Sequence, residues 1–283
     1  MRLIIFTDLD GTLLDHDSYS VDGARHALER IRRQGIPLVF TTSKTRAEVE
    51  ELLAALSLSQ PFIVENGGGL FFPSDFPSLD LSALEPSGPY RALRFGMPYS
   101  FIRRFVEIHG PACGVRGFGD MEAEEVAALT GLSLSQANLA KKREFTEPFV
   151  CDGCFDAFRI LARAGGLSVT RGGRFYHLMG SGQDKGLAVR ETVKIWRGGQ
   201  GPVVSIGLGD SPNDESLLAN VDVPVLVPKP DGSFADLQVE NLRRAPAPGS
   251  VGWGAVVMDL LDARDAKTGL FAAATSNVED DHG

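Results

Sequence analysis

Short apolar runs alternate with amphipathic stretches along the first part of the chain. The apolar runs at residues 3–7, 36–41 and 62–64 have the length of buried strands. The stretches at residues 24–33 and 46–56 instead repeat their apolar positions with the period of a helix. Strands that alternate with helices predict a parallel sheet with right-handed crossovers.

The same pattern returns later in the sequence. Residues 185–196 and 215–220 have the helical period, and residues 203–208 form a buried apolar run. Residues 223–227 give a further strand, and the proline within it predicts an edge strand or the start of a strand. The α/β core is therefore predicted to be discontinuous, with an insert between its two halves.

The segment between the halves has a different composition. From about residue 72 to residue 89, prolines and serines interrupt any regular pattern, which is typical of a chain that leaves a domain. The residues that follow mix helical and strand-like stretches and predict a separate α+β domain. Helices are expected at residues 99–108, 121–129 and 134–142, and strands at residues 144–150, 167–170 and 174–178.

These patterns predict two domains and a tail. The core is expected to combine residues 1–85 and 181–265, with residues 86–180 as the inserted domain. Residues 266–283 are polar, end in acidic residues, and are expected to lack order. The predicted fold class is α/β, with a parallel sheet and an inserted α+β domain.

Composition narrows the classes of function. The 283 residues carry a formal net charge of -9, and the longest basic run is the triplet at residues 141–143, which argues against nucleic-acid binding. The first apolar run meets Asp8 and Asp10 too early for a signal peptide or a membrane span, so a cytoplasmic protein is expected. The three cysteines are an odd number and do not predict a disulfide framework. An anionic substrate would need local cations to hold it.

Two carboxylates directly follow the first predicted strand. Asp8 and Asp10 are two residues apart, so both side chains point to the same side of an extended backbone. Ligands of open α/β sheets bind beyond the carboxyl ends of the strands, which is where this pair lies. Like charges this close repel unless a cation or a shared proton relieves them, and a bound divalent metal is the simplest relief.

Further polar groups are expected at the same edge of the sheet. Thr42 and Ser43 follow the second strand, Lys185 begins the late helix, and Asp210 and Asp214 follow a buried strand. Carboxylate oxygens suit Mg²⁺, and an ammonium and a hydroxyl suit phosphoryl transfer, which depends on positioning and charge neutralisation. Which hydroxyl contacts the phosphate, that of Thr42 or that of Ser43, stays open.

Four features resemble, in chain order, the four signature motifs of the haloacid dehalogenase superfamily: the segment DLDGTLL, the hydroxyl after the second strand, the isolated lysine and the segment GLGDSPND. The resemblance implies a Rossmann-like core whose insert is a cap of the C2 type. It also implies a phosphatase with Asp8 as the nucleophile and Asp10 as the general acid and base; the chemistry alone allows the reverse assignment. Thr42 and Lys185 are then expected to bind the phosphate. Mg²⁺ is expected at Asp8, the backbone carbonyl of Asp10 and Asp210; Asp214 is a further ligand or a residue that orients the ligands, with helix capping as the alternative.

Other stretches resemble the mannosyl-3-phosphoglycerate phosphatase family, notably TTSKTRAEVE and PFIVENGGGLFFP in the core and GFGDM and GRFYHLM in the insert. That family releases mannosylglycerate from mannosyl-3-phosphoglycerate, so the resemblance implies this substrate. Arg143, Arg174 and His177 are expected to supply positive charge to it. The residues expected to bind the substrate are Ser43, Lys44, Asn66, Arg143, Glu144, Arg174, His177 and Asn213.

Several alternatives stay open. The glucosyl compound differs from the mannosyl compound in one hydroxyl configuration, and the same scaffold serves phosphatases of other sugar phosphates, so fold does not fix the substrate. A phosphomutase would keep the phosphate on the protein until a second substrate accepts it. A non-catalytic binding module is disfavoured because Asp8, Asp10, Lys185 and Asp210 are all present. The expected partner is a small sugar phosphate, and the oligomeric state is not predicted.

Overall fold

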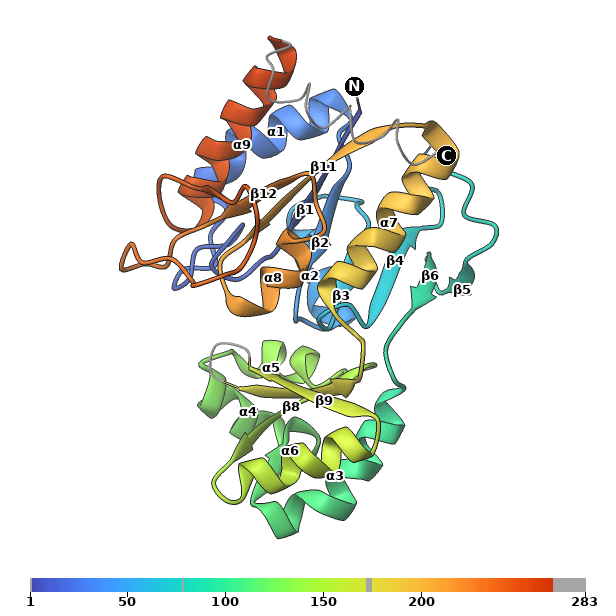
Figure 1. Ribbon diagram of the computed structural model, residues 1–283, viewed down its shortest axis with the longest axis vertical. Coiled ribbons are helices and arrows are strands. Elements are labelled where there is room, and N and C mark those ends of the chain that lie inside the picture. Colours follow the sequence, from blue (N-terminus) through green and yellow to red (C-terminus); the bar gives the residue numbers. More distant parts are fainter. Residues whose placement is uncertain (1, 78, 172–174, 267–283) are drawn as a thin grey trace.

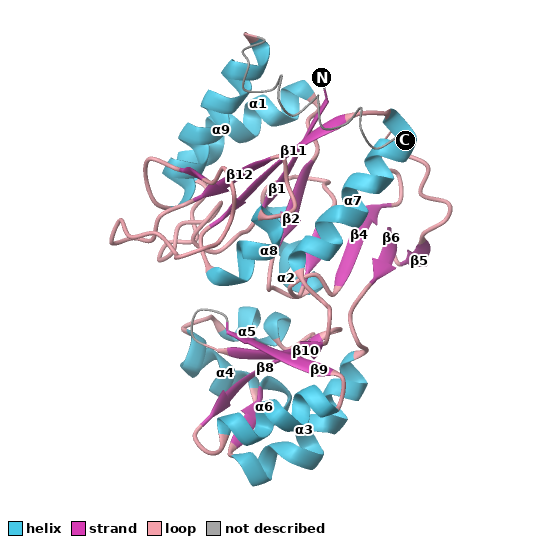
Figure 2. Cartoon of the chain, in the orientation of Figure 1, coloured by secondary structure: helices cyan, strands magenta, loops and turns pink. Residues whose placement is uncertain are grey.

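The computed structural model describes residues 2–77, 79–171 and 175–266, which form two sheets with helices packed around them (Figures 1 and 2). The larger sheet contains six strands that are parallel to their neighbours. Their order is β13-β12-β11-β1-β2-β3, and each neighbouring pair is parallel. The predicted parallel α/β core is therefore confirmed. The strands are β1 (Arg2–Thr7), β2 (Leu38–Thr41), β3 (Phe62–Val64), β11 (Val203–Gly209), β12 (Val223–Leu226) and β13 (Arg243–Arg244).

Helices cover both faces of this sheet. The central strand β1 carries apolar side chains on both of its faces, so each face must be shielded from water. In β1, Leu3 and Ile5 pack into one apolar cluster, and Ile4 and Phe6 pack into another on the opposite face. The first cluster includes residues of α1, α2 and α9, and the second includes residues of α7 and α8. These helices are α1 (Arg25–Gln34), α2 (Arg46–Ala55), α7 (Lys185–Gln200), α8 (Glu215–Leu218) and α9 (Gly249–Asp265).

Three antiparallel strands extend the larger sheet beyond β3. They are β4 (Gly69–Pro73), β6 (Tyr90–Arg94) and β5 (Glu85–Ser87), in this order outward. The expectation that prolines exclude regular structure between residues 72 and 89 is therefore wrong. Pro86 is tolerated because β5 is the outermost strand, where a missing N–H breaks no ladder on the open side.

A second, antiparallel sheet forms the body of the insert, in the order β7-β8-β10-β9. Helices α3 and α6 pack on it through a separate apolar cluster, while α4 and α5 lie nearer the larger sheet (Figure 1). The predicted α+β character of the insert is confirmed, and α6 and α9 are helices that the sequence pattern missed. The elements are α3 (Tyr99–Cys113), β7 (Val115–Gly117), α4 (Ala123–Thr130), α5 (Leu134–Ala140), β8 (Thr146–Cys151), α6 (Phe155–Ala164), β9 (Leu167–Arg171) and β10 (Tyr176–Gly180).

The chain passes between the two sheets twice, after β6 and after β10 (Figure 1). Since β5 and β6 pair with the larger sheet, we propose that the insert begins after Arg94 and not at residue 86. The predicted disordered tail falls almost wholly outside the described residues. Among the helices that the structure describes, none has the length and apolar character needed to cross a membrane.

Candidate active site

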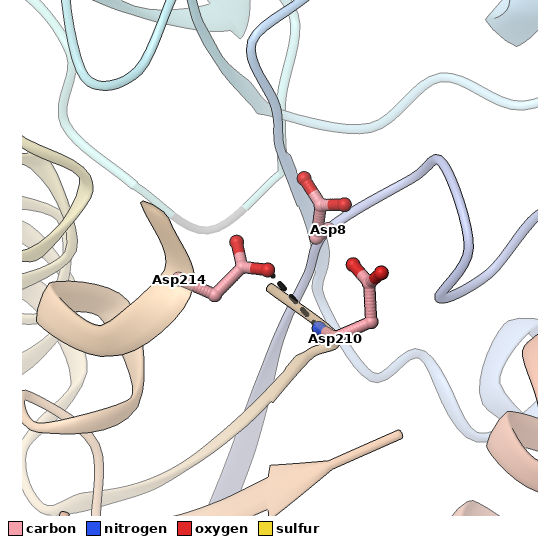
Figure 3. A group of neighbouring side chains, drawn as sticks. All are labelled: Asp8, Asp210 and Asp214. Carbon is pink, nitrogen blue, oxygen red and sulfur yellow. Dashed lines mark hydrogen bonds between the residues drawn. The ribbon is translucent and has the colours of Figure 1, made fainter. Parts of the chain in front are cut away.

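Three carboxylates meet at the carboxyl edge of the parallel strands (Figure 3). Asp8 follows β1 and Asp210 follows β11, and these two strands are parallel neighbours, so their ends lie side by side. Asp214 comes from the one-turn helix Pro212–Asp214 that follows. One oxygen from each carboxylate lies within 4.8 Å of the others. This geometry matches a single site for a cation.

Lys185, the first residue of α7, lies between two of these carboxylates. Its Nζ donates to Oδ1 of Asp8 and to Oδ1 of Asp214, each at 2.6 Å. Its side chain is fully buried. Burial alone would lower the pKa of Lys185, but Asp214 and Asp8 outweigh this effect and raise its pKa above the ordinary value. The ammonium is therefore charged and fixes the orientation of Asp8.

The cluster carries more negative charge than Lys185 balances. Burial raises the pKa of Asp8 well above its usual range; the charge of Asp214 adds to this rise and Lys185 opposes it. Burial, followed by the charge of Asp214, raises the pKa of Asp210 to about 7. Three oxygen donors with an excess of negative charge are what a hard divalent cation prefers. The donor set therefore fits a divalent metal ion.

The loop after β11 holds its carboxylates through hydrogen bonds to the backbone. Oδ2 of Asp214 accepts from the N–H groups of Asp210 at 3.0 Å and Ser211 at 3.1 Å (Figure 3). Thr12 donates to Oδ1 of Asp210 at 3.3 Å. Gly11 has a φ of 78°, and a Cβ there would lie 2.8 Å from Oδ2 of Asp210. The turn after the first strand therefore needs glycine both for its backbone and for this close approach.

Asp10 lies apart from the three-carboxylate cluster. Its Oδ2 pairs with Nζ of Lys44 at 3.0 Å, while Oδ1 is buried without a partner in the described structure. Both residues line the same cavity as Asp8. The carboxylate of Asp10 is thus available to a ligand in the cavity and is not committed to the acidic cluster.

A cavity of about 300 Å³ opens above Asp8, between the core and the insert. Eight of the predicted site residues line it: Asp8, Asp10, Ser43, Lys44, Arg143, His177, Asp210 and Asn213. The remaining wall comes from residues that the sequence analysis did not assign to the site, among them His16, Tyr19, Phe118, Phe175 and Ser211. His16 lies in a loop without a recognisable motif, whereas Tyr19 begins the stretch YSVDGARHALERIRRQGIPLVF, which also resembles the phosphatase family and was the one signal that could have pointed to it.

Other predicted residues lie beside the cavity without lining it. Oγ1 of Thr42 accepts from the backbone N–H of Lys44 at 3.1 Å, and Thr42 is buried behind Ser43. Oδ1 of Asn66 accepts from Asn213 at 3.2 Å. Lys185 and Asp214 act on the site through the contacts described above. Arg174 lies outside the described residues.

Glu144 also faces away from the cavity. Its carboxylate pairs with Nε of Arg46 at 2.9 Å, across the junction between the insert and α2. The geometry therefore does not place Glu144 with the predicted substrate-binding residues on the cavity wall.

The insert presents one guanidinium and one imidazole to the cavity. Nη1 of Arg143 donates to the backbone carbonyl of Ser43 at 2.8 Å, and Nε donates to the carbonyl of Ala140 at 2.8 Å. Nδ1 of His177 is buried and has no partner in the described structure. Burial, helped by the charges of Arg143 and Lys185, lowers the pKa of His177 to about 3. A pKa this low favours a neutral ring at pH 7 and does not support the expectation that His177 supplies positive charge.

Comparisons with known proteins agree with this fold. Residues 5–75 match the family model of haloacid dehalogenase-like hydrolases. The chain superposes on a protein from Thermoplasma acidophilum with a TM-score of 0.63 and 18% identity, covering 92% of this chain and 98% of that one. A phosphatase of the same superfamily from Bacteroides thetaiotaomicron gives a TM-score of 0.63 at 17% identity, covering 93% of this chain and 95% of its own. At these identities the structural likeness shows the fold alone.

Sequence relatives are closer. A glucosyl-3-phosphoglycerate/mannosyl-3-phosphoglycerate phosphatase from Persephonella marina is 42% identical over 263 residues, covering 92% of this chain and 97% of the relative. A protein of the same name from Methanococcoides burtonii is 45% identical over 267 residues, covering 92% and 98%. The chain therefore belongs to the glucosyl-3-phosphoglycerate/mannosyl-3-phosphoglycerate phosphatase family, within the haloacid dehalogenase superfamily.

Proposed function

We propose that this phosphatase hydrolyses the phosphate monoester of mannosyl-3-phosphoglycerate and of glucosyl-3-phosphoglycerate, with Asp8 as its nucleophile. One observation carries the proposal: Asp8 is held by Lys185 at 2.6 Å at the base of a cavity whose opposite wall comes from the insert. The names and coverage of the relatives support the two substrates. Pyrococcus horikoshii provides a further relative, a mannosyl-3-phosphoglycerate phosphatase that is 31% identical over 242 residues.

The first step forms a covalent intermediate on Asp8. Lys185 binds Oδ1 of Asp8, which favours the ionised carboxylate against the rise in pKa caused by burial and Asp214, and directs it toward the cavity. An oxygen of Asp8 attacks phosphorus in line, the new P–O bond forms, and the bond from phosphorus to the glycerate oxygen breaks. Lys185 also neutralises part of the charge that builds up near the phosphoryl oxygens.

Asp10 moves the protons of both steps. Its carboxyl group lines the cavity two residues from Asp8, and its Oδ1 has no partner in the described structure. In the first step Asp10 gives a proton to the leaving glycerate oxygen. In the second it takes a proton from the water that attacks the phosphoaspartate, which frees Asp8 and releases inorganic phosphate. Lys44 pairs with the ionised form of Asp10 at 3.0 Å between these transfers.

Mg²⁺ is the proposed cofactor. Asp8, Asp210 and Asp214 would hold it together with the backbone carbonyl of Asp10, because their oxygens are close together and the mutual repulsion that raises the pKa values of Asp8 and Asp210 favours a cation there. When bound, the ion supplies positive charge to the phosphoryl oxygens and relieves repulsion among the carboxylates.

The insert is proposed to act as a cap that reads the rest of the substrate. Arg143 suits the carboxylate of the glycerate, because a guanidinium forms paired hydrogen bonds with carboxylates. His177 and Asn213 offer neutral hydrogen-bonding groups that suit sugar hydroxyls.

The predicted cytoplasmic location stays a prediction.

The test is phosphate release from the mannosyl and glucosyl compounds and from a panel of common sugar phosphates, with and without Mg²⁺. We expect both phosphoglycerates to exceed the panel by at least about tenfold in kcat/KM, and Asp8→Asn to abolish release from every substrate. Preference for another sugar phosphate would overturn the substrate and keep the mechanism. Slow release with a long-lived phosphoprotein, discharged by a second sugar phosphate, would indicate a mutase instead.

A further inference from the structure

Glu65 is a buried carboxylate with no part in the chemistry described above. It lies in the turn after β3, is fully buried, and has a φ of 50°. Its oxygens accept three hydrogen bonds from the insert: from the N–H of Glu144 at 2.7 Å, from the N–H of Phe145 at 3.1 Å and from Oγ1 of Thr146 at 2.8 Å. Burying a carboxylate away from water costs free energy unless hydrogen bonds from the protein replace those from water. Glu65 therefore fixes the start of β8 to the core.

The segment that Glu65 holds begins directly after Arg143. Arg143 lines the cavity and donates to the carbonyl of Ser43 at 2.8 Å, so its guanidinium lies where the core and the insert meet on the cavity wall. Burial raises the pKa of Glu65, and the nearby charge of Arg143 opposes this rise. The two side chains therefore influence each other, although the structure describes no direct ion pair between them.

The turn that contains Glu65 also contacts two other parts of the site. The backbone carbonyl of Glu65 accepts from Nε2 of Gln183, in the second passage between the sheets, at 2.7 Å. The next residue, Asn66, accepts from Asn213 in the acidic loop at 3.2 Å. Both Glu65 and Asn66 have a positive φ, which non-glycine residues rarely adopt. The turn is therefore held in an unusual conformation that joins the insert, the acidic loop and the core.

We propose that Glu65 is a positioning residue that sets the affinity for substrate through Arg143. Its carboxylate holds residues 144–146, and this places the guanidinium of Arg143 against the part of the substrate that lies beyond the phosphate. The inference rests on the proposed function, because it assumes a substrate with a group for Arg143 to bind. The chemistry at Asp8 does not depend on this contact.

The first experiment compares two substrates in Glu65→Gln. The amide keeps the size of the side chain but replaces one acceptor oxygen with an NH₂ group. This donor then faces an N–H group of the insert, so a charge-assisted hydrogen bond is lost. For the sugar phosphoglycerate we expect KM to rise about tenfold and kcat to change less than about twofold. For p-nitrophenyl phosphate, which lacks the glycerate and the sugar, kcat/KM should stay within about twofold. An equal loss on both substrates, or no loss on either, overturns the proposal.

A matched control separates positioning from general loosening of the insert. Arg46 pairs with Glu144 across the same junction and does not line the cavity. Arg46→Gln should leave KM for both substrates within about twofold, because it removes a junction contact without releasing Arg143. If Arg46→Gln raises KM as much as Glu65→Gln does, the effect belongs to the junction as a whole and the proposal fails.

Two further variants extend the test, and the first of them also keeps it decisive if Glu65→Gln folds poorly. Thr146→Val keeps the shape of the side chain but removes the bond from Oγ1 to Glu65 and the 3.5 Å contact that Oγ1 accepts from Nη1 of Arg143, so it should raise KM in the same way. Glu65→Gln combined with Arg143→Ala should have no higher KM than Arg143→Ala alone, since both act through one contact. Additive effects would contradict the proposal. If the wild type prefers another sugar phosphate, the proposed function fails, and the same comparison made with that substrate still decides the role of Glu65.

Discussion

His177 should make the protein less stable in mild acid. Its ring is buried, and burial with the nearby charges of Arg143 and Lys185 lowers its pKa to about 3. In an unfolded chain a histidine has a pKa of about 6.5. Between these two values the unfolded chain binds a proton that the folded chain does not, so lowering the pH favours unfolding. The stability that the neutral ring permits is complete above about pH 6.5 and is lost as the pH falls toward 3.

The size of this effect follows from the distance below pH 6.5. At pH 5 the solution is about 1.5 pH units below the pKa of a histidine in the unfolded chain. Protonation of that histidine therefore stabilises the unfolded chain by about 2 kcal/mol and lowers the free energy of unfolding by the same amount. The result does not depend on the exact folded pKa, provided that this lies well below 5. Asp210 acts in the opposite direction: burial and the charge of Asp214 raise its pKa to about 7, so its contribution is lost as the pH rises toward 7. A difference between variants is therefore needed to isolate His177.

The assay is urea unfolding in EDTA at pH 7.5, 6 and 5 for the wild type, His177→Gln and His26→Gln. The free energy of unfolding of the wild type, minus that of His177→Gln, should fall by about 2 kcal/mol from pH 7.5 to pH 5. His26 is exposed, so its substitution should leave the pH dependence of the wild type unchanged. Parallel curves for the wild type and His177→Gln would refute the reasoning, because they would show that the ring takes up protons equally in both states.

Four other substitutions test the proposed catalytic centre. Lys185→Met should lower kcat by at least about a thousandfold. In EDTA it should also lower the free energy of unfolding, measured in urea, by about 3–5 kcal/mol, because two buried carboxylates lose their counter-charge. Ser43→Ala should lower kcat/KM about a hundredfold if the hydroxyl on the cavity wall binds phosphate, whereas Thr42→Val should cost less than about tenfold; the reverse order in steady-state kinetics would assign the role to Thr42. Asp210→Asn should weaken Mg²⁺ binding at least about tenfold by calorimetry and stabilise the metal-free protein at pH 7.5.

The core of the fold was predictable because periodicity reports burial directly. The run at residues 3–7 is apolar at every position before Thr7, as a strand buried on both faces must be. Helix α9 was missed because its pattern is not that of a surface helix. It contains Gly252 and Gly254, where a Cβ would lie 1.6 Å from the carbonyl oxygen of Ala247 and 2.4 Å from that of Gly23. Close backbone packing therefore requires glycines that lower helix propensity and hide the element from a sequence pattern.

The catalytic centre was predictable for a different reason. Parallel strands bring their carboxyl ends to one edge, so residues that follow separate strands, such as Asp8 and Asp210, meet without any contact being visible in the sequence. The cap residues had no such rule. Arg143 and Glu144 are neighbours in sequence, yet one lines the cavity and the other pairs with Arg46, because their directions depend on how the insert meets the core.

The proposed chemistry and the proposed recognition consequently lie on different parts of the molecule. Asp8, Asp210 and Lys185 are fixed by strand ends and a helix start, so the insert can change without moving them. In the part of the insert that the structure describes, Arg143 is the single cation on the cavity wall; its other wall groups include the neutral His177 and aromatic rings. Recognition of an anionic substrate then depends on where one guanidinium lies. Substitutions that move it should change KM before they change kcat, whereas substitutions among the core carboxylates should do the opposite.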